Sequence, residues 1–155
     1  MGGFWDKLTG GTKRPGTGVA PLPVQEVRAK LLALNGPDAR YLVRPGVPEE
    51  KADLAAECQI QQVGVTLKIR MRLIPEKHEV RVLEERWAKR SLQNSNGEYG
   101  RGHAPTVYRQ FDFKRGPDGR RRKVETFRFD TREMTVPLQR AVLSAGWIWR
   151  GVLWL

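Results

Sequence analysis

The basic side chains of this sequence occur in clusters, and clusters of this kind are suited to the binding of anions. The chain carries 28 Lys and Arg against 17 Asp and Glu, which gives a net charge of +11. A surplus of this size attracts nucleic acid, acidic proteins or anionic lipid, and it also favours solubility without any partner. Charge alone leaves both interpretations open.

The basic residues concentrate in two regions that the sequence predicts as hairpins. Residues 89–123 hold ten basic and three acidic side chains, and the tip of one hairpin forms a basic knuckle suited to a nucleic-acid groove or to phosphates. The other region offers a basic strand face with Trp87 as a candidate stacking ring. The predicted anion- or nucleic-acid-binding residues are Lys68, Arg70, Arg72, Arg81, Trp87, Lys114, Arg115, Arg120, Arg121, Arg122 and Lys123.

No combination of residues predicts a catalytic or metal centre. The only cysteine, Cys58, lies in an alternating segment that points it into the core, where a thiol is inert. His78 and His103 are far apart in the chain, and zinc sites need three or four ligands. Glu84 and Glu85 are adjacent on a predicted strand and therefore face opposite ways. We expect no catalytic residue, no metal and no cofactor.

A single cysteine also bears on the compartment, because it excludes an internal disulfide and favours a reducing cytoplasm. No apolar run approaches the roughly 20 residues of a transmembrane helix. Residues 1–8 carry Phe4, Trp5 and Leu8, which can form one apolar face of a short helical turn. That face would touch a membrane surface or a partner, or fold back onto its own domain.

Glycine spacing separates a tail from the elements that must position the basic residues. Residues 1–20 contain six glycines, which make an ordered backbone costly, so we expect a flexible tail. Residues 21–155 suit a single domain. A helix is predicted over 23–34 from an apolar stripe at three- and four-residue spacing, with Asn35-Gly36 as its left-handed stop.

Alternation over residues 54–88 predicts strands. From 65 to 73 the odd positions are apolar and the even positions are polar or basic, so the two sets occupy opposite faces. A turn at 75–78 leads to a partner strand at about 79–88. The predicted cross-strand pairs are Leu73 with Val80, Met71 with Val82, Arg72 with Arg81, and Lys68 with Glu85. If cations on this face pair with carboxylates, as Lys68 would with Glu85, the face is a solvated surface of partly paired charges and not a docking surface.

A mobile loop over 91–106 and a second hairpin over 107–114 and 120–130 follow. Pro117-Asp118-Gly119 suits a three-residue loop at the hairpin tip. The resulting register predicts an aromatic face toward the core, made of Phe111, Phe113, Phe127 and Phe129, on which Arg109 fits poorly.

The last unit is predicted as a helix capped by Thr135, with Pro137 in its first turn and Gly146 at its end. A closing core strand over 147–155 carries three tryptophans. The order of elements predicts an α+β fold: an antiparallel sheet of about six to seven strands with an N-terminal and a C-terminal helix packed on one face.

Three segments carry a likeness to known sequences. The stretch 32–37, the hairpin around 72–75 and the stretch 145–152 resemble a family of small uncharacterised actinobacterial proteins of Streptomyces type. The likeness covers most of the chain after the tail, and such relatives carry a longer insert where this chain has residues 61–65. The resemblance implies a bacterial cytoplasmic protein of unknown function, and it supplies no catalytic residues.

These patterns predict a non-enzymatic basic interaction domain that binds an acidic partner. One alternative is a nucleic-acid-binding protein that contacts phosphates with little sequence preference. Another alternative is a small enzyme whose site lies in the 91–106 loop, which requires a deep pocket that holds His103 beside a carboxylate.

Overall fold

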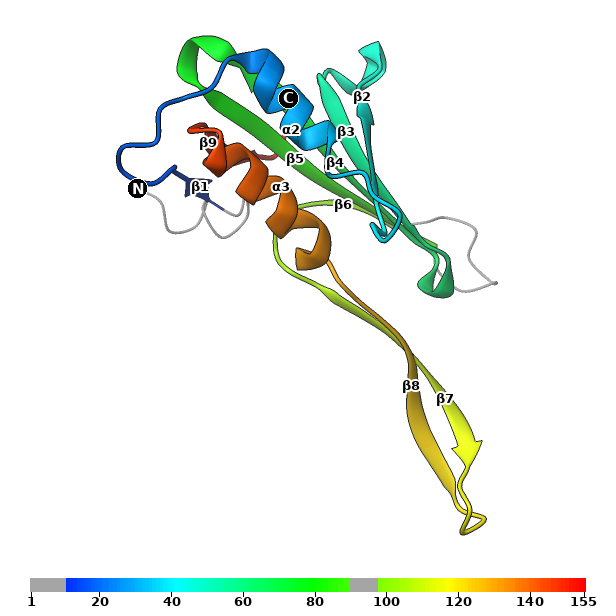
Figure 1. The fold of residues 1–155 in the computed structure, drawn as a ribbon. Helices are drawn as coiled ribbons and strands as arrows, with labels where there is room; N and C mark the ends of the chain where they lie inside the picture. The colour runs from blue at the N-terminus through cyan, green and yellow to red at the C-terminus, as the bar shows by residue number, and fades with distance from the viewer. Residues whose placement is uncertain (1–10, 90–97) are drawn as a thin grey trace.

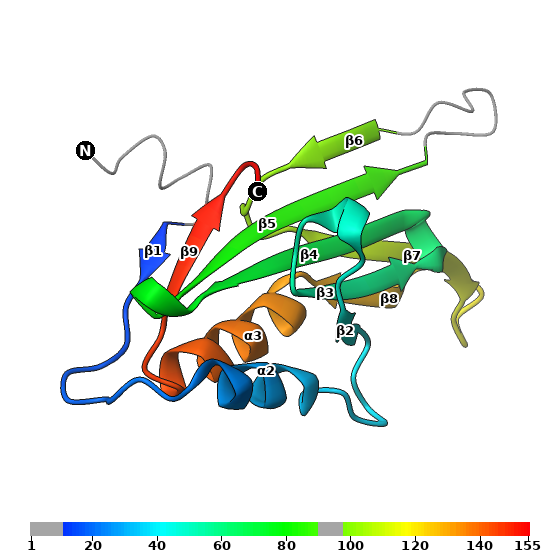
Figure 2. The same cartoon turned by 90° about the horizontal axis from the view of Figure 1, so that it is seen from above.

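The computed structural model describes residues 11–89 and 98–155, and its body has two layers, a sheet and a pair of helices (Figure 1, Figure 2). The strands are β1 (Thr12–Lys13), β2 (Leu42–Pro45), β3 (Leu54–Ile60), β4 (Val65–Ile74), β5 (Glu79–Ala88), β6 (Glu98–Arg101), β7 (Val107–Arg115), β8 (Arg121–Asp130) and β9 (Ile148–Val152). The helices are α2 (Val24–Leu32) and α3 (Arg132–Ser144), and 3-10 turns occur at η1 (Pro48–Glu50), η2 (Gln61–Val63) and η3 (Pro75–Lys77). The class is α+β, as predicted.

Seven strands form the main sheet in the order β1-β9-β5-β4-β3-β2, and β6 also pairs with β5. β9 runs parallel to residues 79–83 of β5, whereas β6 is antiparallel to residues 85–88. The sheet is therefore mixed, and the prediction of a purely antiparallel sheet is wrong. The chain passes through a hairpin and α3 between β5 and β9, and a long crossover of this kind is what parallel pairing requires.

α2 and α3 cover one face of the sheet (Figure 2), and alternation along β3 and β4 packs their apolar side chains into one core with these helices. The buried strand residues of this core include Leu54, Ala56, Cys58, Ile60, Val65, Leu67, Ile69 and Met71. They share one cluster with Val27 and Leu31 of α2 and with Met134, Leu138 and Val142 of α3. All four predicted cross-strand pairs between β4 and β5 occur in the register. The basic positions of β4 consequently face away from the helices, on the outer face of the sheet.

Both helices differ from their predicted bounds. α2 ends at Leu32, and Gly36 does not take the left-handed conformation. Instead, the Asn35 amide donates to the carbonyl of Val43 and accepts from its N–H, both at 2.7 Å. α3 begins at Arg132, so Pro137 lies inside the helix and not in its first turn. The carbonyl of Thr131 accepts the N–H groups of Met134 and Thr135 at 3.1 Å, which starts the helix earlier than the proline predicts.

The second hairpin, β7 and β8, contains a register shift between Gln110 and Phe111 that the sequence did not predict. Phe129 pairs with Tyr108 and is 1% exposed, whereas Phe113 pairs with Lys123 and is 64% exposed. The prediction of one aromatic face over all four phenylalanines is wrong. A bulge adds one residue to one strand, and because side chains alternate, it moves all positions beyond it to the other face.

The first and the last strand of the described chain pair with each other at the edge of the sheet. Thr12 and Lys13, within the predicted tail, pair as β1 with Arg150 and Trp149 of β9. Trp147 and Trp149 are each 1% exposed, but Trp154 lies beyond β9 and is 67% exposed. The predicted closing strand therefore exists in its first half, and the third tryptophan lies outside the core.

Candidate anion-binding surfaces

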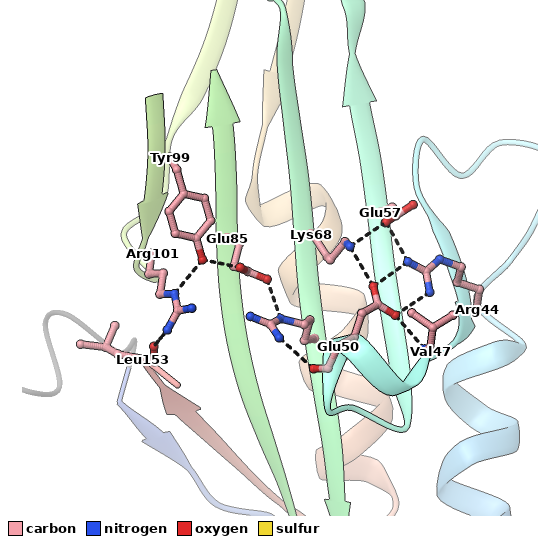
Figure 3. A network of polar contacts seen from close by, with 10 residues as sticks. Arg44, Val47, Glu50, Glu57, Lys68, Glu85, Tyr99, Arg101 and Leu153 are labelled. Atoms are coloured by element: carbon pink, nitrogen blue, oxygen red, sulfur yellow. Dashed lines mark hydrogen bonds and ion pairs between the residues drawn. The ribbon is translucent and has the colours of Figure 1, made fainter. Parts of the chain in front are cut away.

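The outer face of the main sheet carries a compact ion-pair network built around Glu50 (Figure 3). Arg44 donates to both Glu50 oxygens at 2.8 and 2.7 Å and to Glu57 at 2.8 Å. The ammonium of Lys68 lies 2.8 Å from Glu50 and 3.3 Å from Glu57. Two cations therefore face two carboxylates, and this part of the predicted docking surface is neutral overall.

These contacts shift the acidity of the groups that make them. The hydrogen bond from Arg44 holds the pKa of Glu50 well below its ordinary value, although burial opposes the shift. The same guanidinium lowers the pKa of Glu57, and Glu50 in turn raises the pKa of Arg44. Burial lowers the pKa of Lys68, but hydrogen bonds to Glu50 and Glu57 more than offset it, so the net shift is upward. All four groups are held in their ionised forms.

A second cluster follows along the same face (Figure 3). Arg70 donates to Glu85 at 2.5 Å and to the backbone carbonyl of Glu50 at 2.8 Å. The hydroxyl of Tyr99 donates to the other oxygen of Glu85 and accepts a bond from Arg101 Nε at 2.6 Å. Lys68 is opposite Glu85 in the register, as predicted. However, Lys68 forms its ion pairs with Glu50 and Glu57, and Glu85 forms its ion pair with Arg70.

Arg72 and Arg81 complete the basic residues predicted on this face. Arg81 Nε donates to Glu79 at 3.0 Å, and Arg150 donates to the other oxygen of Glu79 at 2.7 Å. Burial raises the pKa of Glu79, but these two bonds dominate and lower it. Arg72 is exposed, and no carboxylate in residues 11–89 or 98–155 pairs with it. Three of the four predicted cations of the sheet are thus neutralised within the fold.

The β7–β8 hairpin behaves differently, because it projects from the body as a separate two-stranded sheet (Figure 1). Its base is fixed where Thr131 N–H donates to Thr106 O at 2.9 Å and where Arg40 donates to Arg128 O at 2.8 Å. No residue from 111 to 126 is buried. We refer to residues 111–126 as the arm.

The arm carries most of its charge at the tip. From 114 to 123, six residues are basic and one is acidic. Lys114 lies opposite Arg122, and Arg115 lies opposite Arg121. In the described part of the chain, no side chain of the tip residues Lys114, Arg115, Arg120, Arg121 and Lys123 forms an ion pair with a carboxylate. Arg122 lies 3.4 Å from Asp118, but both side chains are largely in water, where such a pair is weak.

The turn at the tip holds these cations in a defined arrangement. Gly116 N–H donates to Arg120 O at 2.9 Å, and Gly119 N–H donates to Gly116 O at 3.0 Å. Gly119 has φ of 75°, the left-handed conformation expected at this position of the loop. Asp118 accepts a bond from Arg120 N–H at 3.1 Å. The basic side chains therefore extend from a closed turn.

His103 lies in a cavity of about 310 Å³ beside Glu84, the arrangement that the enzyme alternative requires. Its Nδ1 is 3.2 Å from Glu84, its Nε2 is 3.0 Å from Val152 O, and its side chain is 2% exposed. Both ring nitrogens are thus occupied by partners within the protein, and a general base needs one that can reach a substrate. The geometry indicates a structural role, in which His103 links the segment before β7 to Glu84 of β5 and to Val152 of β9.

The other predicted chemical features also have defined positions. Cys58 is buried, and burial raises the pKa of its thiol, which makes it a poor nucleophile. No group of three or more His, Cys, Asp or Glu side chains suited to a metal ion occurs in the residues that the structure describes. Within the same residues, no helix has the length and apolarity to cross a membrane. The predicted membrane contact of residues 1–8 lies outside the described residues.

Sequence reasoning missed the residue that organises the outer face. Glu50 is not among the predicted site residues, but η1 folds its segment onto the sheet and leaves Glu50 6% exposed. Glu50 also accepts the Val47 N–H at 2.9 Å, which closes the turn. A proline-initiated turn before an acidic residue is a local signal of such a cap, but its contacts with Arg44 and Lys68 depend on tertiary structure.

Comparisons with protein-family models, with curated proteins and with solved structures give no match.

Proposed function

We propose that this protein is a non-enzymatic basic interaction domain whose arm binds nucleic acid with little sequence preference. The observation that supports the proposal most is the set of six basic side chains at the tip of a projecting hairpin, of which only Arg122 has a carboxylate partner, Asp118, among the described residues. Like charges directly opposite each other destabilise a strand pair, and a bound polyanion would remove that repulsion.

The shape of the arm favours nucleic acid over a folded acidic protein. A two-stranded β-ribbon fits the major groove of a DNA duplex, and strands are an established means of reaching a groove. Alternation sends Lys114 and Arg122 to one side of the ribbon and Arg115 and Arg121 to the other. Phosphates line both walls of a groove, so cations on both sides of the ribbon would all find partners.

A second candidate is an acidic protein partner that binds the same arm. Phe111 and Phe113 favour it, because they are 41% and 64% exposed and contacts with phosphate do not require apolar rings. In the unbound protein, the ammonium of Lys123 lies 4.3 Å from the ring centre of Phe111, and this cation–π contact satisfies part of that ring. The proposal places either complex in the cytoplasm, where a lone thiol stays reduced.

The test measures the affinity for a fluorescent DNA duplex as a function of salt, for the wild type and for Arg120→Ala/Arg121→Ala/Arg122→Ala. Each phosphate contact contributes about 0.9 to the slope of log affinity against log salt, so the triple variant should reduce the slope by about 3. A scrambled duplex should bind as well as the first, because contacts with phosphate carry no sequence information.

The matched control removes three exposed cations from the body, with Lys30→Ala/Lys77→Ala/Arg140→Ala. It lowers the net charge equally and should leave most of the slope intact. Equal losses in the two variants would show that net charge is responsible and not the arm. An absence of duplex binding together with an arm-dependent protein complex would favour the second candidate.

A further inference from the structure

Two exposed aromatic rings lie side by side on the outer face of the sheet. Trp87 of β5 is paired in register with Tyr99 of β6, and their ring centroids are 5.2 Å apart with planes inclined at 47°. Trp87 is 37% exposed and Tyr99 is 47% exposed. The contact between the rings therefore leaves a large part of each ring exposed to solvent.

The Tyr99 ring is held in place by its hydroxyl group (Figure 3). The hydroxyl donates to Glu85 and accepts from Arg101, whose Nη1 also donates to the backbone carbonyl of Leu153 at 2.7 Å. Glu85 is fixed in turn by Arg70. A ring anchored in this way loses little conformational freedom when a ligand stacks on it, which favours binding.

Cations surround the ring pair. Lys68 Nζ lies 5.7 Å from the ring centre of Trp87, and the Arg101 guanidinium lies 5.7 Å from the ring centre of Tyr99. Lys68 is paired with glutamates, but Arg101 is exposed, and it donates to the hydroxyl of Tyr99 and to the backbone carbonyl of Leu153. Arg101 can therefore contact a phosphate that is linked to a base on the rings.

We propose that Trp87 and Tyr99 form a stacking site for an unpaired base of single-stranded nucleic acid. This inference rests on the proposed function, since it names a second contact for the same class of ligand. Aromatic rings stack on any nucleobase, and Arg supports such sites through phosphate and cation–π contacts. In a duplex, each base face is covered by its neighbours, so only an unpaired base can offer its face to the rings.

The test compares two labelled strands of equal length and charge, an oligothymidylate of about 16 nucleotides and an abasic strand of deoxyribose phosphate. Phosphate contacts act on both strands, whereas stacking acts only on the strand with bases. The wild type should bind the oligothymidylate about 5-fold to 100-fold more tightly than the abasic strand. Trp87→Ala and Tyr99→Ala should each remove most of this preference and leave the affinity for the abasic strand nearly unchanged.

Two controls separate stacking from general damage. Trp87→Phe keeps a ring and should retain most of the preference, whereas Trp154→Ala removes an exposed ring outside the pair and should retain all of it. Equal binding of both strands by the wild type overturns the stacking site but leaves the arm proposal standing. A preference that survives both alanine substitutions also overturns it. If neither strand binds but the duplex does, the stacking site is overturned and the arm proposal stands. If the duplex also fails to bind, the proposed function itself fails.

Discussion

The outer face of the main sheet and the arm contain the same kinds of basic residue in opposite electrostatic situations. On the sheet, Arg44, Lys68 and Arg70 are each within 3.3 Å of a glutamate. On the arm, Lys114 and Arg115 have other cations opposite them and no carboxylate partner in the described residues. The cations of the sheet form ion pairs that stabilise the fold, whereas the cations of the arm repel one another and destabilise it.

The number of cations on a surface is therefore a poor guide to its capacity for anion binding. A guanidinium that already donates to a carboxylate must lose that bond before it can bind phosphate, which costs free energy in a partly buried site. An exposed guanidinium with only water around it has no such cost.

The two ends of the second hairpin should differ most in their effect on stability. Phe129→Ala removes a ring that is 1% exposed and should lower the free energy of unfolding by about 3–5 kcal/mol. Phe113→Ala removes a ring that is 64% exposed and should change it by less than about 0.5 kcal/mol. Chemical denaturation followed by circular dichroism measures both. Similar losses for the two variants would mean that the arm packs on the body in solution.

Removal of the arm should separate binding from folding. Gln110 and Phe127 are directly opposite each other, so an Asn-Gly turn can replace residues 111–126. The shortened protein should lose more than about 100-fold in duplex affinity at low salt, because six tip cations are gone. Its free energy of unfolding should stay within about 0.5 kcal/mol of the wild type. If the shortened protein retains its affinity for the duplex, the binding site lies on the body and not on the arm.

The sheet network should contribute to stability and hardly to binding. Glu50→Gln weakens the contacts with Arg44 and Lys68 and should lower the free energy of unfolding by about 2 kcal/mol at neutral pH. Duplex affinity should change less than about 2-fold, because neither cation is released from Glu57. A large gain in affinity would show that the sheet cations are available after all.

The same substitution should flatten the dependence of stability on pH. The pKa of Glu50 and that of Glu57 are lower in the folded protein than in the unfolded chain, where a glutamate has a pKa of about 4.3. Their stabilisation is complete above the unfolded pKa and is lost as the pH falls toward the folded value. Unfolding free energies measured between neutral pH and acid should therefore decrease less steeply in Glu50→Gln than in the wild type.

The smallest effect concerns the like charges within the arm. Lys114→Glu places a carboxylate opposite Arg122 and should stabilise the strand pair by about 0.2–1 kcal/mol while it weakens duplex binding. Hydrogen exchange of the arm amides measures the first effect, and titration with duplex measures the second. An arm that exchanges faster after the substitution would argue against repulsion between Lys114 and Arg122.

Local patterns predicted the parts of the fold in which alternation continues without interruption. The register of β4 and β5 follows from the apolar positions of 65–73 and from a turn that is four residues long. The prediction from alternation failed in the second hairpin, because one bulge moves every side chain beyond it to the other face. No residue type at Gln110 or Phe111 indicates a bulge. The parallel placement of β9 depends on the crossover through α3, which local patterns do not determine.

The candidate site was predictable to a similar degree. The six basic tip residues follow from composition and from the turn at 117–119, and all six are exposed. The sheet residues were assigned to the correct face, but their carboxylate partners were not predicted. Lys68 pairs with Glu50, which reaches it because η1 folds over the sheet, whereas Arg70 pairs with Glu85 and Arg81 pairs with Glu79. Charge can be counted from a sequence, whereas the partner of each charge is a property of the tertiary structure.

The most direct test of the central claim is an NMR titration of the isotope-labelled protein with a short DNA duplex. The account predicts that the amide signals of the tip, with Gly116 and Gly119 as well-resolved reporters, shift in proportion to the bound fraction, while those of residues 68–72 on the sheet remain in place. Shifts confined to residues 68–72, with the tip unchanged, would contradict it.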